Sequence, residues 1–146
     1  MDELLKNEII TLLKSKNKRI TVAKIDILAY FHQSNKSYSL SELYAKIPDK
    51  YNRSTLFRNL QDLSEDGILE KFINANGVDT FLINCEVNKS TQNSHSHFKC
   101  TDCNAIENLP LLSDNIITSL GNKKINSFNL IIEGVCDDCS LKNNHE

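Results

Sequence analysis

Four cysteines in two matched pairs constrain the fold of this chain more than any other feature. The pairs are Cys100-Thr101-Asp102-Cys103 and Cys136-Asp137-Asp138-Cys139, with 32 residues between them. Tetrahedral zinc takes four ligands, and each C-x-x-C turn supplies two thiolates. A closed Cys₄ site leaves no position open for chemistry, so we expect one structural zinc per chain in a small C-terminal domain. Redox dithiols and unrelated buried cysteines are the alternatives, although a redox motif normally opens a helix in a βαβ setting.

The chain composition favours an intracellular protein. Its 146 residues allow one domain or two small ones. No apolar run approaches the roughly 18 residues of a membrane span, and the acidic start at Asp2 and Glu3 is unlike a signal peptide. Five cysteines without an export signal favour metal binding over disulfides. We therefore expect a cytoplasmic protein with no membrane partner.

The net charge of −2 is distributed unevenly along the chain. Residues 11–58 hold ten basic and three acidic side chains, a net of +7 (10 − 3). Residues 85–146 hold five basic and eight acidic side chains, a net of −3 (5 − 8). A basic segment joined to an acidic one indicates an anionic partner for the basic segment. On charge alone, a solvated lysine-rich face is the alternative.

Local signals predict four helices followed by a pair of strands. A capping box starts the third helix at Ser39, Asn52 caps the fourth helix, and Gly67 ends it. Asn76-Gly77 is typical of a hairpin turn between the two strands. The predicted elements, in chain order, cover residues 2–14, 21–31, 39–47, 53–66, 68–73 and 78–83.

This order of elements is typical of a winged helix-turn-helix, with 53–66 as its recognition helix. The helix begins with hydrogen-bond donors and cations, and a helix N-terminus itself favours phosphate. Such an end can enter the major groove of DNA, which is about 12 Å wide. We therefore predict that the first half of the chain binds double-stranded DNA through Arg53, Ser54, Thr55 and Arg58. A small helical domain that binds protein is the alternative.

The second half is predicted to be a small α+β domain that follows a polar hinge. Residues 85–94 have no hydrophobic period, which gives domains at 1–84 and 95–146 with a hinge at 85–94. His95 and His97 stand two residues apart on a predicted strand, so both imidazoles can reach one ion. Since the cysteines already fill a zinc site, this pair is available for a second metal. Two surface histidines are the alternative. A helix over 111–120 and a strand over 128–132 complete the domain.

In this order the motifs resemble the ferric uptake regulator family over nearly the whole chain. The matching residues are Ser54-Thr55-Leu56-Phe57-Arg58 with Gly67, then His95-x-His97-x-x-Cys100-x-x-Cys103, then Gly134-x-Cys136-x-x-Cys139. Members are homodimers that bind operator DNA when a divalent metal occupies a sensory site. The resemblance implies an α+β fold with an N-terminal winged helix and a C-terminal dimerisation domain. It also implies that Cys100, Cys103, Cys136 and Cys139 hold structural zinc and that His95 and His97 are sensory ligands.

The chain departs from the family pattern at several positions. The stretch before the first cysteine pair is Ser94-His95-Ser96-His97, where the family usually has His-His-Asp-His. Phe57 replaces a tyrosine that touches a base, and it keeps apolar contact with a thymine methyl. Lys24 replaces an arginine of the second helix, and it can still meet a phosphate. Phe57 and Lys24 therefore join the predicted DNA contacts.

Other residues must complete the sensory site. We prefer Cys85, which ends the predicted hairpin, and Glu107 is the second candidate. A His₂Cys set would favour zinc, whereas His₂Glu would suit iron(II) or manganese. The sequence leaves the second metal open among Zn²⁺, Fe²⁺ and Mn²⁺. The alternatives are a small buried apolar role for Cys85 and a solvated strand position for Glu107.

The sequence thus predicts a metal-dependent transcriptional repressor of metal-homeostasis genes, responsive to iron or zinc. A constitutive winged-helix adaptor whose zinc is only structural is the alternative. We expect no enzyme activity, because the chain has no His-Glu-x-x-His motif, Gly-rich phosphate loop or Gly-x-Ser-x-Gly elbow.

Overall fold

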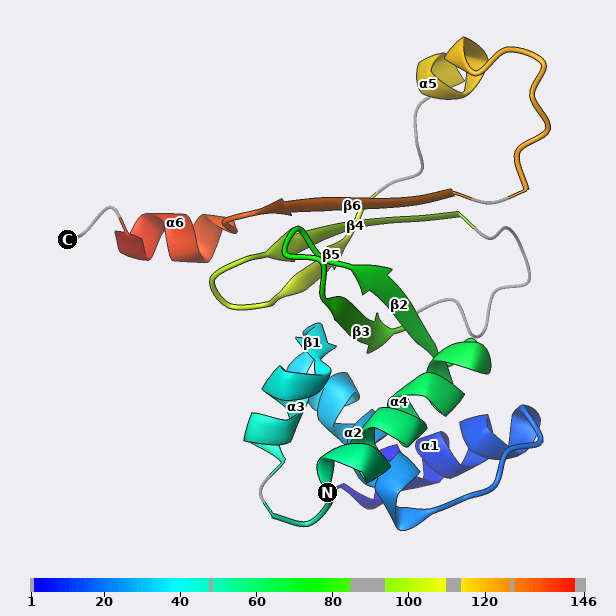
Figure 1. Cartoon of the computed structure of the whole chain (residues 1–146), viewed down its shortest axis with the longest axis vertical. Helices are drawn as coiled ribbons and strands as arrows, with labels where there is room; N and C mark the ends of the chain where they lie inside the picture. Colours follow the sequence, from blue (N-terminus) through cyan, green and yellow to red (C-terminus); the bar gives the residue numbers. More distant parts are fainter. Residues whose placement is uncertain (1, 48, 85–93, 110–113, 127, 144–146) are drawn as a thin grey trace. The chain divides into compact units, whose positions relative to one another are not determined.

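The computed structural model describes residues 2–47, 49–84, 94–109, 114–126 and 128–143. The chain divides into two compact units, unit 1 (Met1–Val87) and unit 2 (Asn88–Glu146), each with its own sheet (Figure 1). The predicted hinge at 85–94 lies outside the described residues except for Ser94, which begins a strand. Among the described helices, none is long and apolar enough to cross a membrane.

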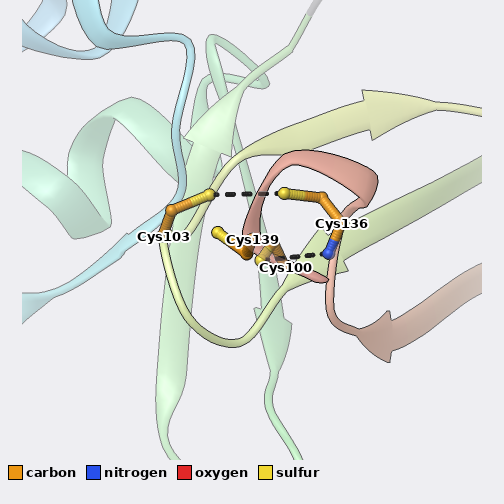
Figure 2. A group of neighbouring side chains, drawn as sticks. All are labelled: Cys100, Cys103, Cys136 and Cys139. Atoms are coloured by element: carbon orange, nitrogen blue, oxygen red, sulfur yellow. Dashed lines mark hydrogen bonds between the residues drawn. The ribbon is translucent and has the colours of Figure 1, made fainter. Parts of the chain in front are cut away.

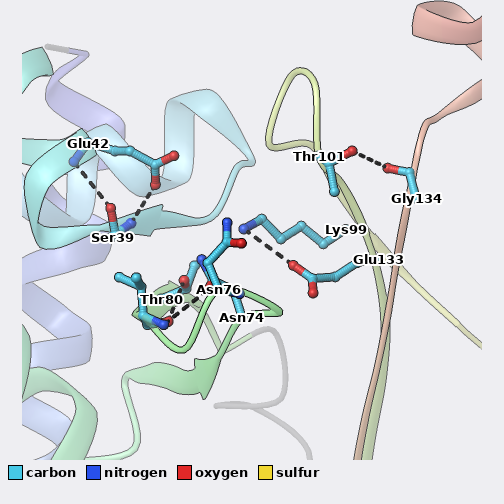
Figure 3. A network of polar contacts seen from close by, with 10 residues as sticks. Ser39, Glu42, Asn74, Asn76, Thr80, Lys99, Thr101, Glu133 and Gly134 are labelled. Atoms are coloured by element: carbon cyan, nitrogen blue, oxygen red, sulfur yellow. Dashed lines mark hydrogen bonds and ion pairs between the residues drawn. The ribbon is translucent and has the colours of Figure 1, made fainter.

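Side-chain caps start the helices of unit 1. Asn52 accepts a hydrogen bond from the N–H of Thr55 at 2.7 Å, as its predicted capping role requires. Ser39 and Glu42 form the predicted capping box, with reciprocal hydrogen bonds of 3.3 and 2.8 Å (Figure 3). Gly67 adopts a φ of +70° and ends the fourth helix, as predicted. The helices are α1 (Glu3–Ser15), α2 (Val22–Ser34), α3 (Leu40–Lys46) and α4 (Arg53–Glu65).

The sheet of unit 1 contains the predicted hairpin and one additional strand. β2 (Leu69–Ile73) pairs antiparallel with β3 (Asp79–Ile83), and Gly77 in the turn has a φ of +77°. β1 (Tyr38–Ser39) pairs with β3, so the strand order is β1-β3-β2. Two residues give no periodicity, so the sequence did not predict β1. The helices and hairpin form the predicted winged helix-turn-helix.

Helix α4 has one buried face and one exposed face. Leu56, Leu60 and Leu63 are fully buried in the core of unit 1, and their i, i+4, i+7 spacing puts them on one side of the helix. Phe57 and Arg58 are exposed. The core therefore fixes which side chains α4 presents to a partner.

The turn between α3 and α4 is pinned to α2 through Asp26. The Tyr51 hydroxyl donates to Asp26 Oδ2 at 2.6 Å, and Lys50 Nζ donates to the same oxygen at 2.5 Å. Burial alone would raise the pKa of Asp26, but the hydrogen bonds from Lys50 and Tyr51 outweigh burial and hold the pKa below its ordinary value. The ionised carboxylate thus fixes the segment that leads into α4.

Unit 2 is built around a three-stranded sheet in the order β5-β4-β6. β4 pairs antiparallel with β5 and parallel with β6, and the crossover that the parallel pairing needs contains α5 (Figure 1). The strands predicted around His97 and over 128–132 are confirmed, whereas the last helix was not predicted. The elements are β4 (Ser94–Cys100), β5 (Ile106–Asn108), α5 (Asp114–Ser119), β6 (Phe128–Gly134) and α6 (Asp137–Asn143).

Replacing Asp26 with Asn should weaken unit 1 in a pH-dependent way. At pH 7 we expect the free energy of unfolding to fall by about 1 kcal/mol, because the Tyr51 hydroxyl loses a charged acceptor. Because the pKa of Asp26 is lower in the native state than in the unfolded state, its contribution to the free energy of unfolding is complete above the unfolded pKa of about 3.9. That contribution is lost as the pH falls through the native pKa. Urea unfolding followed by circular dichroism at pH 7 and below pH 4 measures the difference.

Asp49→Asn, at an exposed position in the same turn, is the matched control. It should change the free energy of unfolding by less than about 0.5 kcal/mol at either pH. A difference between Asp26→Asn and the parent that stayed the same at both pH values would contradict the role of Asp26.

Candidate metal centre and nucleic-acid interface

The four cysteine side chains of unit 2 converge on one point (Figure 2). Cys100 ends β4 and Cys103 lies in the turn after it, whereas Cys136 follows β6 and Cys139 lies in α6. All four Sγ atoms lie within 4.8 Å of one another. Tetrahedral zinc with Zn–S bonds of about 2.3 Å requires sulfurs about 3.8 Å apart. The Sγ atoms of Cys103 and Cys136 are 3.9 Å apart, which matches this requirement.

Backbone pairing brings the two cysteine turns together. In the parallel register of β4 and β6, Cys100 lies opposite Gly134, so both turns leave the sheet at the same edge. The backbone N–H and hydroxyl of Thr101 donate to the Gly134 carbonyl at 2.7 and 3.1 Å (Figure 3). A Cβ atom at position 134 would lie only 3.2 Å from the ring of Phe98. Glycine at this position therefore lets the Phe98 ring pack close to the backbone at the end of β6.

The thiols of the cluster differ in how readily they ionise. Burial alone would raise the pKa of Cys100, but N–H groups of Cys136, Cys103 and Asp102 donate to its sulfur and lower the pKa to about 6. The N–H of Cys136 lies 3.4 Å from that sulfur. A hydrogen bond to Cys136 and burial raise the pKa of Cys139 to about 12. One thiolate is therefore available near neutral pH, and a metal must displace at least one proton to bind all four sulfurs.

These residues fit a structural zinc ion. Thiolates are soft ligands that suit Zn²⁺, and four protein sulfurs complete a tetrahedron without an open position. Cys100 is buried and the other three cysteines are half-buried, so the protein covers much of the site. Among the described residues, this is the one group of three or more Cys, His, Asp or Glu side chains close enough to hold an ion.

Of the three preferred sensory ligands His95, His97 and Cys85, the structure describes the side chain of His97. This residue lies in β4 with 5 % of its surface exposed, and its Nδ1 is 2.9 Å from Oδ1 of Asn108. His95 lies two residues earlier in β4, opposite Asn129 of β6, and only its backbone is described. Cys85 lies outside the described residues.

Glu107 is not brought together with His97. It pairs with Phe98, whereas His97 pairs with Asn108. Directly opposite residues share a face of a sheet and successive residues alternate, so Glu107 and His97 lie on opposite faces. Asn108 is the neighbour that sequence reasoning missed, because the pairing register of two strands is not visible in residue spacing.

Most of the predicted DNA contacts lie on the exposed side of α4. Phe57 is 48 % exposed, and Ser54 and Arg58 are exposed. Arg53 is exposed as well, and its Nη2 donates to the hydroxyl of Ser41 on α3 at 2.8 Å. Thr55 is half-buried in the first turn of α4. This face therefore offers hydrogen-bond donors, two cations and one aromatic ring.

Lys24 is placed differently from the other predicted contacts. It is only 8 % exposed, and its ammonium lies 3.8 Å from a carboxylate oxygen of Asp62 on α4. A nine-tenths buried cation beside a carboxylate is not presented to a phosphate. We therefore leave Lys24 out of the DNA-contacting set. The sequence analysis placed it in that set because it replaces an arginine of the family pattern, without knowledge of the neighbouring Asp62.

The similarity of this chain to known proteins extends over both units. A model of the ferric uptake regulator family matches residues 15–132. The peroxide operon regulator of Bacillus subtilis is 25 % identical over 145 residues, which cover 94 % of this chain and 95 % of that protein. The ferric uptake regulation protein of Staphylococcus epidermidis is 27 % identical over 144 residues, which cover 94 % and 98 %.

Solved structures have the same fold. The ferric uptake regulator of Vibrio cholerae is 25 % identical with a TM-score of 0.62, over 86 % of this chain and 98 % of that one. A zinc uptake regulator, solved with zinc and DNA, has a TM-score of 0.69 at 14 % identity, over 97 % of each chain. Because the zinc uptake regulator is only 14 % identical to this chain, its similarity shows a common fold alone.

Replacing Cys139 with Ser should abolish tight zinc binding, because a hydroxyl is a poor zinc ligand. We expect about one zinc per chain in the parent and almost none in the variant after dialysis, measured by elemental analysis. Zinc affinity of the parent should fall at least about 100-fold from pH 8 to pH 6, because at least one proton competes with the metal. Competition with a chromophoric chelator measures this change.

Cys85→Ser is the matched control, since it removes the fifth cysteine and leaves the cluster intact. It should keep the structural zinc. Full zinc content in Cys139→Ser, or a zinc affinity independent of pH, would show that the cluster does not bind as four thiolates.

Proposed function

This chain belongs to the ferric uptake regulator family, and on that premise we propose that it is a DNA-binding transcriptional regulator controlled by a metal ion. The more specific proposal is a cytoplasmic repressor of metal-homeostasis genes. The observation that carries the DNA-binding part is the exposed face of α4, a helix that three buried leucines position and whose N-terminal half ends the basic segment 11–58 of net charge +7.

The chemistry of α4 suits base reading in a major groove. Arg53 and Arg58 carry charges that can meet phosphates, and Ser54 and Thr55 carry hydroxyls that can meet base edges. Exposed Phe57 offers apolar contact to a thymine methyl group. We propose that arginine contacts set the position of α4 on DNA and that the three other side chains read the sequence.

A homodimer is supported by the apolar surface of unit 2. Large hydrophobic side chains of this unit are each more than one-third exposed in the single chain, and a second copy can cover them. A two-fold dimer would place two recognition helices in successive major grooves, roughly 34 Å apart. The exposed residues are Ile116, Leu120, Ile125, Ile132, Val135 and Leu141.

The sensory metal is proposed to bind at His97 together with His95 and Cys85. The strand register argues against Glu107, which lies on the other face of the sheet from His97, and Cys85 stays the third ligand that the sequence favours. A His₂Cys set favours zinc over iron(II) or manganese as the sensed ion. The bound metal would stabilise the DNA-binding state of the protein, with a coupling of about 1–3 kcal/mol. The alternative is a constitutive DNA-binding adaptor with structural zinc alone.

Arg58→Ala should weaken binding to all DNA sequences, because a phosphate contact carries no sequence information. The slope of log affinity against log salt concentration should fall by about one. Phe57→Ala should instead reduce the preference for operator over random DNA. Titrations of labelled DNA at several salt concentrations measure both effects. Lys142→Ala, on α6 of unit 2, is the control and should bind like the parent. An unchanged salt slope in folded Arg58→Ala would refute this interface.

His97→Ala should keep the structural zinc but lose the effect of added metal on DNA affinity. In the parent we expect added Zn²⁺ to raise DNA affinity about 5- to 150-fold. His32→Ala is the matched control, at an exposed position in α2, and it should respond to metal as the parent does. A metal response in His97→Ala equal to the parent's would place the sensory site elsewhere. A parent that does not respond at all would support the constitutive adaptor.

A further inference from the structure

Asn108 faces His97 across the sheet of unit 2. The two residues are directly opposite each other in the antiparallel pair β4–β5. The N–H of Leu109 donates to the Ser96 carbonyl at 2.9 Å, one residue beyond the pair on each strand. This pattern makes His97 and Asn108 a non-hydrogen-bonded pair, in which Cα atoms are only about 4.5 Å apart and side chains are closest.

The contact between the two side chains determines the state of the imidazole. Asn108 Oδ1 lies 2.9 Å from His97 Nδ1, and an amide oxygen can only accept a hydrogen bond. With Oδ1 of the amide turned toward the ring, Nδ1 donates and carries the proton of the neutral ring, which puts the lone pair on Nε2. Metal-binding histidines usually donate their other ring N–H to a carbonyl or carboxylate in this way.

We propose that Asn108 is a positioning residue that selects the Nε2-ligating tautomer of His97 and holds the ring for the second metal. This inference rests on the proposed metal site at His97 and adds which nitrogen binds and which residue prepares it. Glu107 cannot do the same work, because it lies on the other face of the sheet. The neutral amide orients the ring without the added basicity that a carboxylate would give.

The tautomer can be measured without the second metal. Long-range ¹H–¹⁵N NMR of protein loaded only with structural zinc distinguishes a proton on Nδ1 from one on Nε2, and His97→Ala assigns the signal. We expect the proton on Nδ1 in the parent. Asn108→Leu removes the acceptor and should give a mixture or a shift to Nε2–H. Asn108→Asp keeps an acceptor oxygen and should restore the parent tautomer.

The same variants should change metal affinity in parallel. Zn²⁺ is titrated by calorimetry into protein whose structural site is already filled. Asn108→Leu should weaken this second binding event about 10- to 100-fold, whereas Asn108→Asp should bind at least as tightly as the parent. Asn122→Leu makes the same change at an exposed turn residue of unit 2 and should leave both the tautomer and the affinity unchanged. If Asn108→Leu does not fold, Asn108→Ala replaces it.

Three results would overturn the inference, and they separate it from the proposed function. A proton on Nε2 in the parent would contradict the role of Asn108 directly. Loss of the second zinc in His97→Ala, with parent-like affinity and tautomer in Asn108→Leu, would overturn the inference alone. Parent-like second binding in His97→Ala would overturn both the proposed metal site and the inference that rests on it.

Discussion

The convergence of four thiols is the constraint on which unit 2 depends. Among the described residues of this unit, Cys100 is the one buried side chain in the hydrophobic class, and the large buried apolar cluster belongs to unit 1. A small domain without such a core usually needs a metal, a disulfide or a partner subunit to fold. The cysteine cluster supplies the metal ligands, and the exposed apolar side chains provide a surface that a partner can cover.

The two units therefore obtain their stability from different physical sources. Unit 1 relies on buried leucines and helix caps, and its helix α4 is set by the core and by the contact of Tyr51 with Asp26. Unit 2 relies on ligand chemistry, because its sulfurs must lose protons and gain a cation to be satisfied. A chain organised in this way can keep unit 1 and the exposed face of α4 folded while metal availability acts on unit 2.

Signals that act within a few residues could be predicted from the sequence. The cap at Asn52, the capping box at Ser39 and the left-handed glycine at Gly67 each involve neighbours within a few positions, so the helices followed from them. The cysteine cluster could also be predicted, since paired C-x-x-C turns restrict the geometry strongly. Features that depend on pairing between distant segments could not. They include strand β1, the burial of Lys24 beside Asp62, and the contact of His97 with Asn108.

The parallel register between β4 and β6 has a consequence for how this domain can misfold. Phe128, Leu130 and Ile132 alternate along β6, so a slip of two residues would keep the same apolar face and cost little in burial. That slip would carry Cys136 and Cys139 about 7 Å away from the other two sulfurs. In a chain with this shifted register, only two of the four sulfurs could bind the same ion. Binding of one ion by all four sulfurs thus favours the native register of β4 and β6 over a shifted register that the hydrophobic pattern alone would allow.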